Sequence, residues 1–286
     1  MRRVGAIFSP YPNPPEALRE AVLAAEAAGV PELWVWEDCF RESAFAVAGA
    51  ALAWTQRLRI GVGIAPMPLR NVAATAMEIA TIDRMFPGRL LPGVGHGVQS
   101  WMGQVGARVA SPLTLLGEYV PALRGLLAGE EVTARGRYVT LEGVRLDWPP
   151  ASAPLVYAAA EGPKTLRAAG AVADGVVLDS RHTPRELADS IGAVRAGRAE
   201  EGVAGEPDVV AYVVAAFGAD ATARATAALD DSVYGGLDAS DAAERVVAGS
   251  VAEVAAGVDR FFDAGVDDVV LLPTADAALQ IGRAHV

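Results

Sequence analysis

A few short stretches of the sequence combine glycines with side chains that can move protons. In segment 93–97, GVGHG, His96 stands between Gly95 and Gly97. A histidine can exchange a proton near neutral pH, although a single histidine is more often structural. The same glycines could instead form a phosphate-binding loop. However, the third glycine comes one residue too early for the dinucleotide-binding pattern G-x-G-x-x-G.

A second group of reactive side chains, Glu37, Asp38 and Cys39, follows an apolar run. Either carboxylate could act as an acid, a base or a hydrogen-bond acceptor, or it could cap a helix or pair with Arg41. Successive strand residues point to opposite faces, so we expect only one carboxylate to reach a shared site. Cys39 has no evident base beside it, and we interpret it as a bystander thiol.

A third stretch, AEGPK at 160–164, could bind an anion. Ala160 ends an apolar run, Glu161 and Gly162 turn, and Pro163 takes the first position of a helix, which prolines favour. Free N–H groups in the first helical turn can bind a phosphate, and Lys164 adds positive charge. An ordinary turn between a strand and a helix gives the same pattern.

Apolar runs alternate along the chain with Ala-rich segments of helical period. We expect strands at 4–8, 32–38, 58–65, 89–95, 154–160, 173–179, 208–217 and 267–273. We expect helices at 14–28, 43–54, 71–85 (with Asn71 as N-cap), 113–128, 163–173, 184–200 and 250–264, and helical sequence from about 219. Nearly continuous apolar strands are typical of a parallel sheet buried on both faces. Eight such units in 286 residues predict an α/β fold, the (β/α)8 TIM barrel.

The alternation pauses after the fourth strand, which predicts an insertion there. We expect a loop at 98–112 and a hairpin at 130–148, within a single domain spanning 1–286. The alternative is an open doubly wound sheet, whose glycine loop follows the first strand. Here that position reads SPYPNPP, which cannot cradle a pyrophosphate. In a barrel the active site lies at the C-terminal ends of the strands, so all three stretches described above would meet there.

Composition narrows the function. The net charge of −11 disfavours nucleic acid and anionic membranes as partners. No apolar run reaches the roughly 18–20 residues of a membrane helix. The three histidines lie far apart without metal-ligand spacing, and the single cysteine excludes an internal disulfide. The apolar run near the N-terminus is too short for a signal peptide, and we interpret it as a strand. The single cysteine, Cys39, leads us to expect a cytoplasmic protein.

The region 58–97 resembles the signature region of the bacterial luciferase-like monooxygenases and F420-dependent reductases. The shared pattern begins with a glycine-rich strand (Gly61 and Gly63), followed by an arginine in the next loop (Arg70). It continues with an aspartate near the end of a helix (Asp83), then Gly-Arg (88–89) and G-x-G-x-G (93–97). The later segments 159–178 and 258–273 are similar to this family as well. Glycines inside a strand mark a close backbone approach, which either a flat cofactor or tight packing would explain.

The resemblance implies a flavin or deazaflavin at the C-terminal mouth of the barrel. It places a non-prolyl cis peptide at Gly63–Ile64, and the cofactor phosphate at the loop after the fifth strand. Members of the family usually carry an acidic residue at the end of the second strand, often followed by a histidine. In this sequence Asp38 matches the acidic residue, and Cys39 replaces the histidine. The expected cofactor-binding residues are Asp38, Gly63, Ile64, Gly95, His96, Gly97, Ala160, Glu161, Gly162, Pro163 and Lys164, and either Asp38 or His96 would move protons.

The compact chain resembles the methylene-tetrahydromethanopterin reductase branch, which implies cofactor F420, hydride transfer to a small organic substrate, and a homodimer. The first alternative is an FMN-dependent monooxygenase served by a separate flavin reductase. The second is a non-catalytic protein that binds flavin or F420. An aldolase is disfavoured because no strand end before Lys164 carries a lysine for a Schiff base. We expect segments 98–112 and 230–248 to line the substrate pocket.

Overall fold

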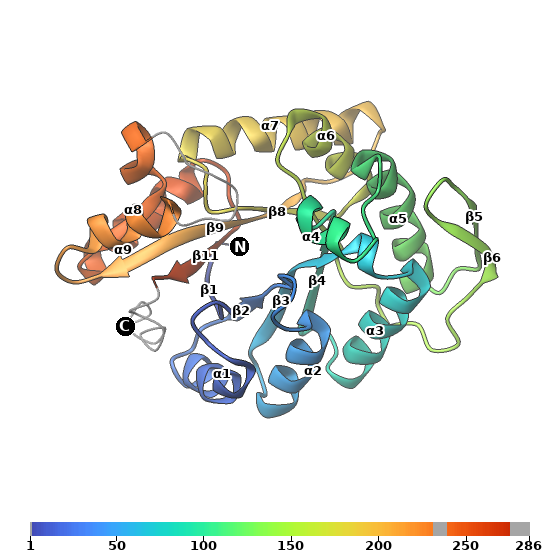
Figure 1. Ribbon diagram of the computed structural model, residues 1–286, viewed down its shortest axis with the longest axis horizontal. Coiled ribbons are helices and arrows are strands. Elements are labelled where there is room, and N and C mark those ends of the chain that lie inside the picture. Colours follow the sequence, from blue (N-terminus) through green and yellow to red (C-terminus); the bar gives the residue numbers. More distant parts are fainter. Residues whose placement is uncertain (1, 231–238, 275–286) are drawn as a thin grey trace.

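The computed structural model describes residues 2–230 and 239–274, and these form a closed (β/α)8 barrel, as predicted (Figure 1). All strands of the barrel run parallel, and β9 closes it by pairing with both β8 and β11. In order around the barrel, the strands are β1 (Arg3–Ile7), β2 (Glu32–Val35), β3 (Arg59–Pro66), β4 (Leu90–Gly95), β7 (Tyr157–Ala159), β8 (Gly175–Leu178), β9 (Asp208–Phe217) and β11 (Asp268–Pro273).

Helices surround the strands as the sequence predicts. They are α1 (Leu18–Ala27, after the 3-10 turn η1, Pro15–Ala17), α2 (Ala44–Trp54), α3 (Val72–Met85, after η2, Met67–Leu69), α6 (Pro163–Val172), α7 (Pro184–Glu200), α8 (Ala221–Asp230) and α9 (Val251–Asp263). The Asn71 side chain accepts a hydrogen bond from the Ala73 N–H, which confirms it as an N-cap. Thr183 and Ser250 start α7 and α9 with capping boxes.

The insertion after the fourth strand contains helix α5 (Pro112–Leu127) and an antiparallel hairpin of β5 (Val132–Arg135) and β6 (Thr140–Val144), at one side of the barrel (Figure 1). The predicted hairpin is confirmed. The prediction of a loop over all of 98–112 is wrong, because Gln99–Gln104 forms the short helix α4. The fully buried Met102 anchors this helix, which is too short to show helical periodicity in the sequence.

A further strand, β10 (Val246–Gly249), was not predicted from the sequence. It pairs with the C-terminal half of β9, beyond the residues of β9 that pair with β8. The 3-10 turn η3 (Ala239–Glu244) leads into it. Of the segment predicted to line the substrate pocket, 231–238 lies outside the described residues. Four residues carry too little pattern to identify a strand, and only the long β9 provides the partner.

Three aromatic side chains fill the barrel interior. Trp34 packs edge-on against Tyr157 and Tyr212, with ring centroids 5.8 and 6.1 Å away. A Cβ on Gly61 would overlap the Trp34 indole, and a Cβ on Gly63 would overlap the Tyr212 hydroxyl. The glycines in β3 are therefore explained by tight packing inside the barrel.

Charged residues close the N-terminal end of the barrel. Glu32 and Asp268, at the starts of β2 and β11, are fully buried. Arg3 pairs with Asp268, and Arg59 pairs with Glu32. In this fold, the N-terminal face supports stability and the opposite face carries the site.

Candidate cofactor and active site

The most distinctive backbone feature of the C-terminal face is a bulge in β3. The Gly63–Ile64 peptide is cis, as predicted, and the pairing of β3 with β4 shifts register between Val62 and Ala65. Both carbonyls at the bulge are held: the Tyr212 hydroxyl donates to the Gly63 oxygen at 3.1 Å, and the Glu37 N–H donates to the Ile64 oxygen at 3.2 Å. The bulge is thus fixed from across the barrel and from the neighbouring strand.

The Glu37 carboxylate is fully used in hydrogen bonds that hold the fold together. Its buried carboxylate accepts two hydrogen bonds from the Arg70 guanidinium and one from the Ala44 N–H at 3.0 Å. Arg70 also donates to Glu78 at 3.2 Å. This network ties the end of β2 to the starts of α2 and α3, so Asp38 is the carboxylate of the pair that remains available at the mouth.

Asp38 accepts a hydrogen bond from the Tyr11 hydroxyl at 2.8 Å. Burial raises the pKa of Asp38, although the Tyr11 hydrogen bond and the charge of Arg41 oppose the change. Burial and the nearby Asp38 charge raise the pKa of Tyr11 to about 12. Asp38 and Tyr11 therefore form a hydrogen-bonded, partly desolvated pair of acidic groups beside the end of β2.

Cys39 is half-buried, and its peptide with Phe40 is also cis. Burial, together with the charges of Glu37 and Asp38, raises the pKa of the thiol. A raised pKa keeps a thiol protonated and weakens it as a nucleophile, which agrees with its interpretation as a bystander.

The glycine-rich end of β4 is shaped by contact with β3. A Cβ on Gly93 would overlap the Val62 carbonyl, and a Cβ on Gly95 would lie 3.0 Å from the Ile64 side chain. The glycines thus allow β4 to approach the bulge. His96 follows them, with Nδ1 2.6 Å from the Gly97 carbonyl oxygen. Because a carbonyl only accepts, Nδ1 carries a proton and Nε2 is the nitrogen left to exchange one.

The loop after β7 has the form predicted from the sequence. Ala160 is buried, residues 161–164 are exposed, and α6 begins at Pro163. No side chain caps α6, and a Cβ on Gly162 would meet nothing within 4 Å. Lys164, the only lysine of the chain, lies in this first turn. These features fit the phosphate that the family resemblance implies.

A cluster after β8 was missed in the sequence. His182 Nδ1 lies 2.9 Å from Asp179 Oδ1, and Arg181 Nε lies 2.9 Å from Asp179 Oδ2. Arg181 also reaches Glu161 at 3.4 Å, which joins this cluster to the loop after β7. The signal was available, because Asp179 ends an apolar run at a strand terminus, but His182 was considered only as a metal ligand.

The cluster holds opposite charges together. Burial opposes ionisation of Asp179, but the hydrogen bond and charge of His182, together with Arg181, lower its pKa to about 2. Burial also opposes the charged form of His182, but Asp179 raises the pKa of this imidazole. Burial and the Asp179 charge raise the pKa of Glu161, while the neighbouring Arg181, and after it His96 and His182, oppose this change. The mouth therefore brings the ends of β4, β7 and β8 into one electrostatic unit.

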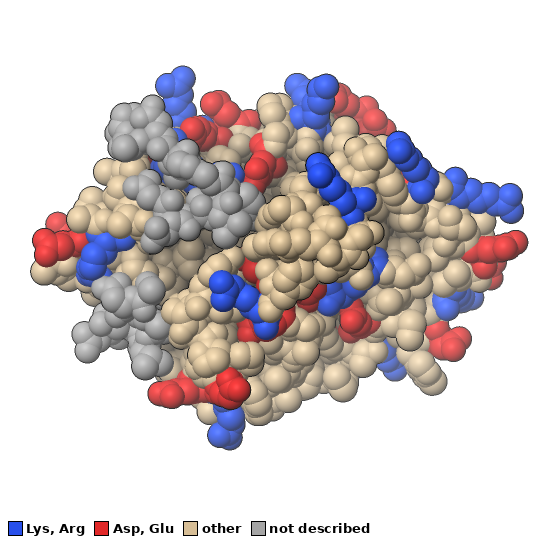
Figure 2. All heavy atoms as spheres, in the orientation of Figure 1, with Lys and Arg blue, Asp and Glu red and all other residues tan. Residues whose placement is uncertain are grey.

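The described part of the chain gives no support for a metal site, a membrane-spanning helix or a nucleic-acid-binding surface. Residues 2–230 and 239–274 contain no group of three His, Cys, Asp or Glu side chains placed to hold a metal ion. Within the same ranges, every helix is too short or too polar to cross a bilayer. On the face shown in Figure 2, basic and acidic side chains are interspersed, unlike the continuous basic surface that nucleic-acid binding uses.

The fold and site define a TIM-barrel protein with a bulged third strand and a polar C-terminal mouth. The family model of luciferase-like monooxygenases matches residues 2–268, and the chain belongs to this family. It is 31% identical over 209 residues to a 5,10-methylenetetrahydromethanopterin reductase of Methanolobus tindarius. That match covers 71% of this chain and only 62% of the relative.

Solved structures share the fold. The coenzyme F420-dependent tetrahydromethanopterin reductase of Methanopyrus kandleri superposes with a TM-score of 0.82 at 20% identity, over 99% of this chain and 98% of that one. An F420-dependent secondary alcohol dehydrogenase, in complex with an F420–acetone adduct, gives 0.88 at 22% identity, over 100% and 98%. At such identities the likeness establishes the barrel architecture.

Proposed function

We propose that the chain is an F420-dependent oxidoreductase that transfers a hydride between the deazaflavin and a small organic substrate. The observation that carries the proposal is the combination, at one mouth, of the bulge at Gly63–Ile64 and the uncapped start of α6 beside Lys164. The printed names of the two solved relatives described above support F420, and FMN is the alternative because a monooxygenase of the same fold was solved in complex with FMN at 16% identity.

The residues of the mouth have distinct roles in this proposal. Gly162, Pro163 and Lys164 hold the phosphate, and Gly63 and Ile64 support the ring system. The strand ends Gly95–Gly97 and Ala160–Glu161 border the cofactor. When bound, the deazaflavin supplies the hydride chemistry, while the protein orients the reactants and excludes water.

Transfer of a hydride to a carbonyl carbon requires a proton at the oxygen, and the mouth offers two groups for it. Burial raises the pKa of Asp38 above the ordinary value of a carboxyl group, which makes it a stronger proton acceptor than an exposed carboxylate. His96 is held through Nδ1, so Nε2 is the atom that would exchange the proton. We infer that one of these two side chains moves the proton.

The test is titration of the purified protein with F420 and with FMN in separate experiments, followed by absorbance. We expect micromolar binding of F420. Binding of FMN without F420 would show instead an FMN-dependent monooxygenase, which needs a flavin reductase. Binding of F420 without turnover over a broad panel of ketones, alcohols and enones would indicate a non-catalytic carrier.

The proposal also includes the oligomeric state of the protein and its cellular compartment. We infer a homodimer in the cytoplasm, in line with the resemblance and with the single cysteine of the sequence. Light scattering on the purified protein distinguishes a dimer from a monomer, and fractionation of the producing cells tests the location.

A further inference from the structure

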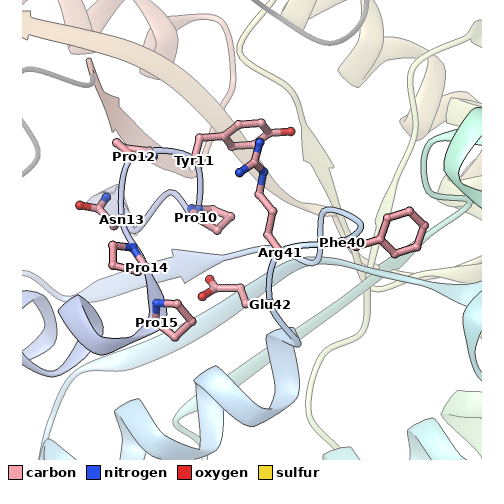
Figure 3. Close-up of a pocket in the computed structure, with 9 residues that line it drawn as sticks. All are labelled: Pro10, Tyr11, Pro12, Asn13, Pro14, Pro15, Phe40, Arg41 and Glu42. Atoms are coloured by element: carbon pink, nitrogen blue, oxygen red, sulfur yellow. The ribbon is translucent and has the colours of Figure 1, made fainter.

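A pocket lies beside the mouth, between two loops that follow β1 and β2. Residues 10–15 form one wall and residues 40–42 form the other, and the cavity has a volume of about 390 Å³ (Figure 3). We call it the Glu42 pocket. Four prolines in the first loop make its wall rigid and largely apolar, whereas the exposed Phe40 ring points away from that loop (Figure 3).

Glu42 is the unusual member of the lining. Both carboxylate oxygens are buried and accept no hydrogen bond. Burial alone raises the pKa of Glu42 to about 7. A desolvated carboxylate without a donor is costly, and a structure normally provides a partner for it. In Figure 3 the side chain points toward the proline-rich loop rather than into solvent.

The neighbouring polar groups are engaged elsewhere. The Arg41 guanidinium stacks on the Tyr11 ring, 4.0 Å from its centroid, as Figure 3 shows. The Tyr11 hydroxyl donates to Asp38, and the Asn13 amide donates to the Ser9 carbonyl at 3.0 Å. None of these three side chains therefore supplies the donor that Glu42 lacks.

The charges of the pocket favour a cation. Arg41 is the cation of the lining, and its guanidinium stacks on Tyr11 instead of pairing with Glu42. An ionised Glu42 therefore carries a negative charge that no side chain of the pocket pairs by a hydrogen bond. Glu42 thus lacks both a hydrogen-bond donor and a positive partner. An ammonium group provides both, because it brings a positive charge and up to three N–H donors.

We propose that the Glu42 pocket binds an organic ammonium group, which donates to the Glu42 carboxylate while its apolar part lies against the prolines. Tyr11 contacts both this pocket and Asp38, so a bound amine would lie next to the mouth of the barrel. Use of the pocket to anchor an amine-bearing substrate rests on the proposed function, whereas ammonium binding does not.

The experiment compares three probes of similar size: benzylammonium, benzyl alcohol and benzoate. Calorimetry should show that the wild-type protein binds benzylammonium at least about tenfold more tightly than the other two, the preference expected of a charge-assisted hydrogen bond. Glu42→Gln keeps the shape of the side chain and should abolish this preference. The matched control is Glu20→Gln, on an exposed position of α1, which should bind like the wild type.

Protonation of Glu42 provides a second readout that does not depend on a variant. Infrared difference spectra of the wild type should show loss of a protonated carboxyl band when benzylammonium is added near pH 6. Binding should release protons and strengthen as the pH rises from about 6 to about 8, since the carboxylate must ionise first.

Equal binding of the three probes, unchanged preference in Glu42→Gln, or an unchanged carboxyl band would each overturn the inference. F420 binding is measured on the same preparations. A protein that binds benzylammonium as expected but does not bind F420 contradicts the proposed function and leaves the ammonium site in place.

Discussion

The Tyr212 hydroxyl donates a hydrogen bond of 3.1 Å to the Gly63 carbonyl, across the barrel interior and 149 residues along the chain. The same hydroxyl occupies the space that a Cβ on Gly63 would fill. One side chain of β9 therefore both requires glycine in β3 and fixes the direction of the bulge carbonyl. The bulge proposed to support the cofactor depends on this long-range pair.

The first prediction follows from this pair. Tyr212→Phe leaves the partly buried Gly63 carbonyl without its donor, which we expect to cost about 1 kcal/mol of unfolding free energy. If the bulge supports the deazaflavin, F420 binding should also weaken about tenfold, with a shifted absorbance band. Tyr119→Phe is the control, because it removes a buried hydroxyl contact with Thr75 at 2.6 Å outside the barrel. Equal loss of F420 affinity in both variants would contradict a specific role for Tyr212.

The second prediction concerns the phosphate. Lys164→Ala should weaken binding of F420 much more than binding of its phosphate-free chromophore, because only F420 carries the anion that Lys164 and the start of α6 would hold. Arg185→Ala, also exposed and in the first turn of α7, should leave both affinities unchanged. Fluorescence titration with the two ligands measures the difference. Equal binding of both ligands by the wild type would remove the phosphate assignment.

The third prediction concerns the pair of His182 with Asp179. His182 has a raised pKa, so its contribution to stability is present below the ordinary histidine pKa and is lost as the pH rises through the raised value. Asp179 has a lowered pKa of about 2, so its contribution is lost as the pH falls toward that value. The pair should therefore be strongest between about pH 4 and about pH 6.5.

His182→Asn keeps a donor but removes the charge, and we expect it to cost about 1 kcal/mol in that window, with a smaller loss at higher pH. Denaturant unfolding at several pH values measures the cost, and proton NMR of the imidazole measures the pKa directly. A His182 that titrates at or below the ordinary histidine value would show that the pair is weaker than the geometry indicates.

The fourth prediction concerns the closed end of the barrel. Burial, with the charge of Glu32, raises the pKa of Asp268 to about 7, although Arg3 opposes this shift. Between about pH 4 and about pH 7 the folded protein then holds a proton that the unfolded chain releases, so this residue makes stability fall as the pH rises. Asp268→Asn removes the titration and should flatten that fall.

Unfolding free energies of the wild type and Asp268→Asn at pH 5 and pH 8 test this sign. Asp263→Asn is the control, because Asp263 is exposed and pairs only with an exposed Arg2 among the described contacts. The fall should persist in part, since Glu42 has a raised pKa in the same range. Parallel pH curves for the wild type and Asp268→Asn would refute the assignment.

The barrel was predictable from the order of apolar and helical segments along the chain, and with it the face on which the candidate site is expected. Continuous apolar runs separated by helical periods specify parallel strands, and the closing strand pairs follow from their number. The start of α6 at Pro163 and the N-cap at Asn71 were also predictable, because prolines and caps act within a few residues. Local chemistry of this kind can be read from neighbouring residues.

The contacts between polar residues could not be predicted from the sequence and are known from the three-dimensional structure. It assigned Glu37 to Arg70, thirty-three residues away, and left Asp38 at the mouth. It brought Tyr212 to Gly63, joined Glu161 to Arg181, and buried Glu42 under the loop of residues 10–15 without a partner. It also revealed β10, which is a strand only because β9 extends beyond β8. These relations depend on closure of the barrel, which brings distant strand ends to one face, and no local pattern records such distances.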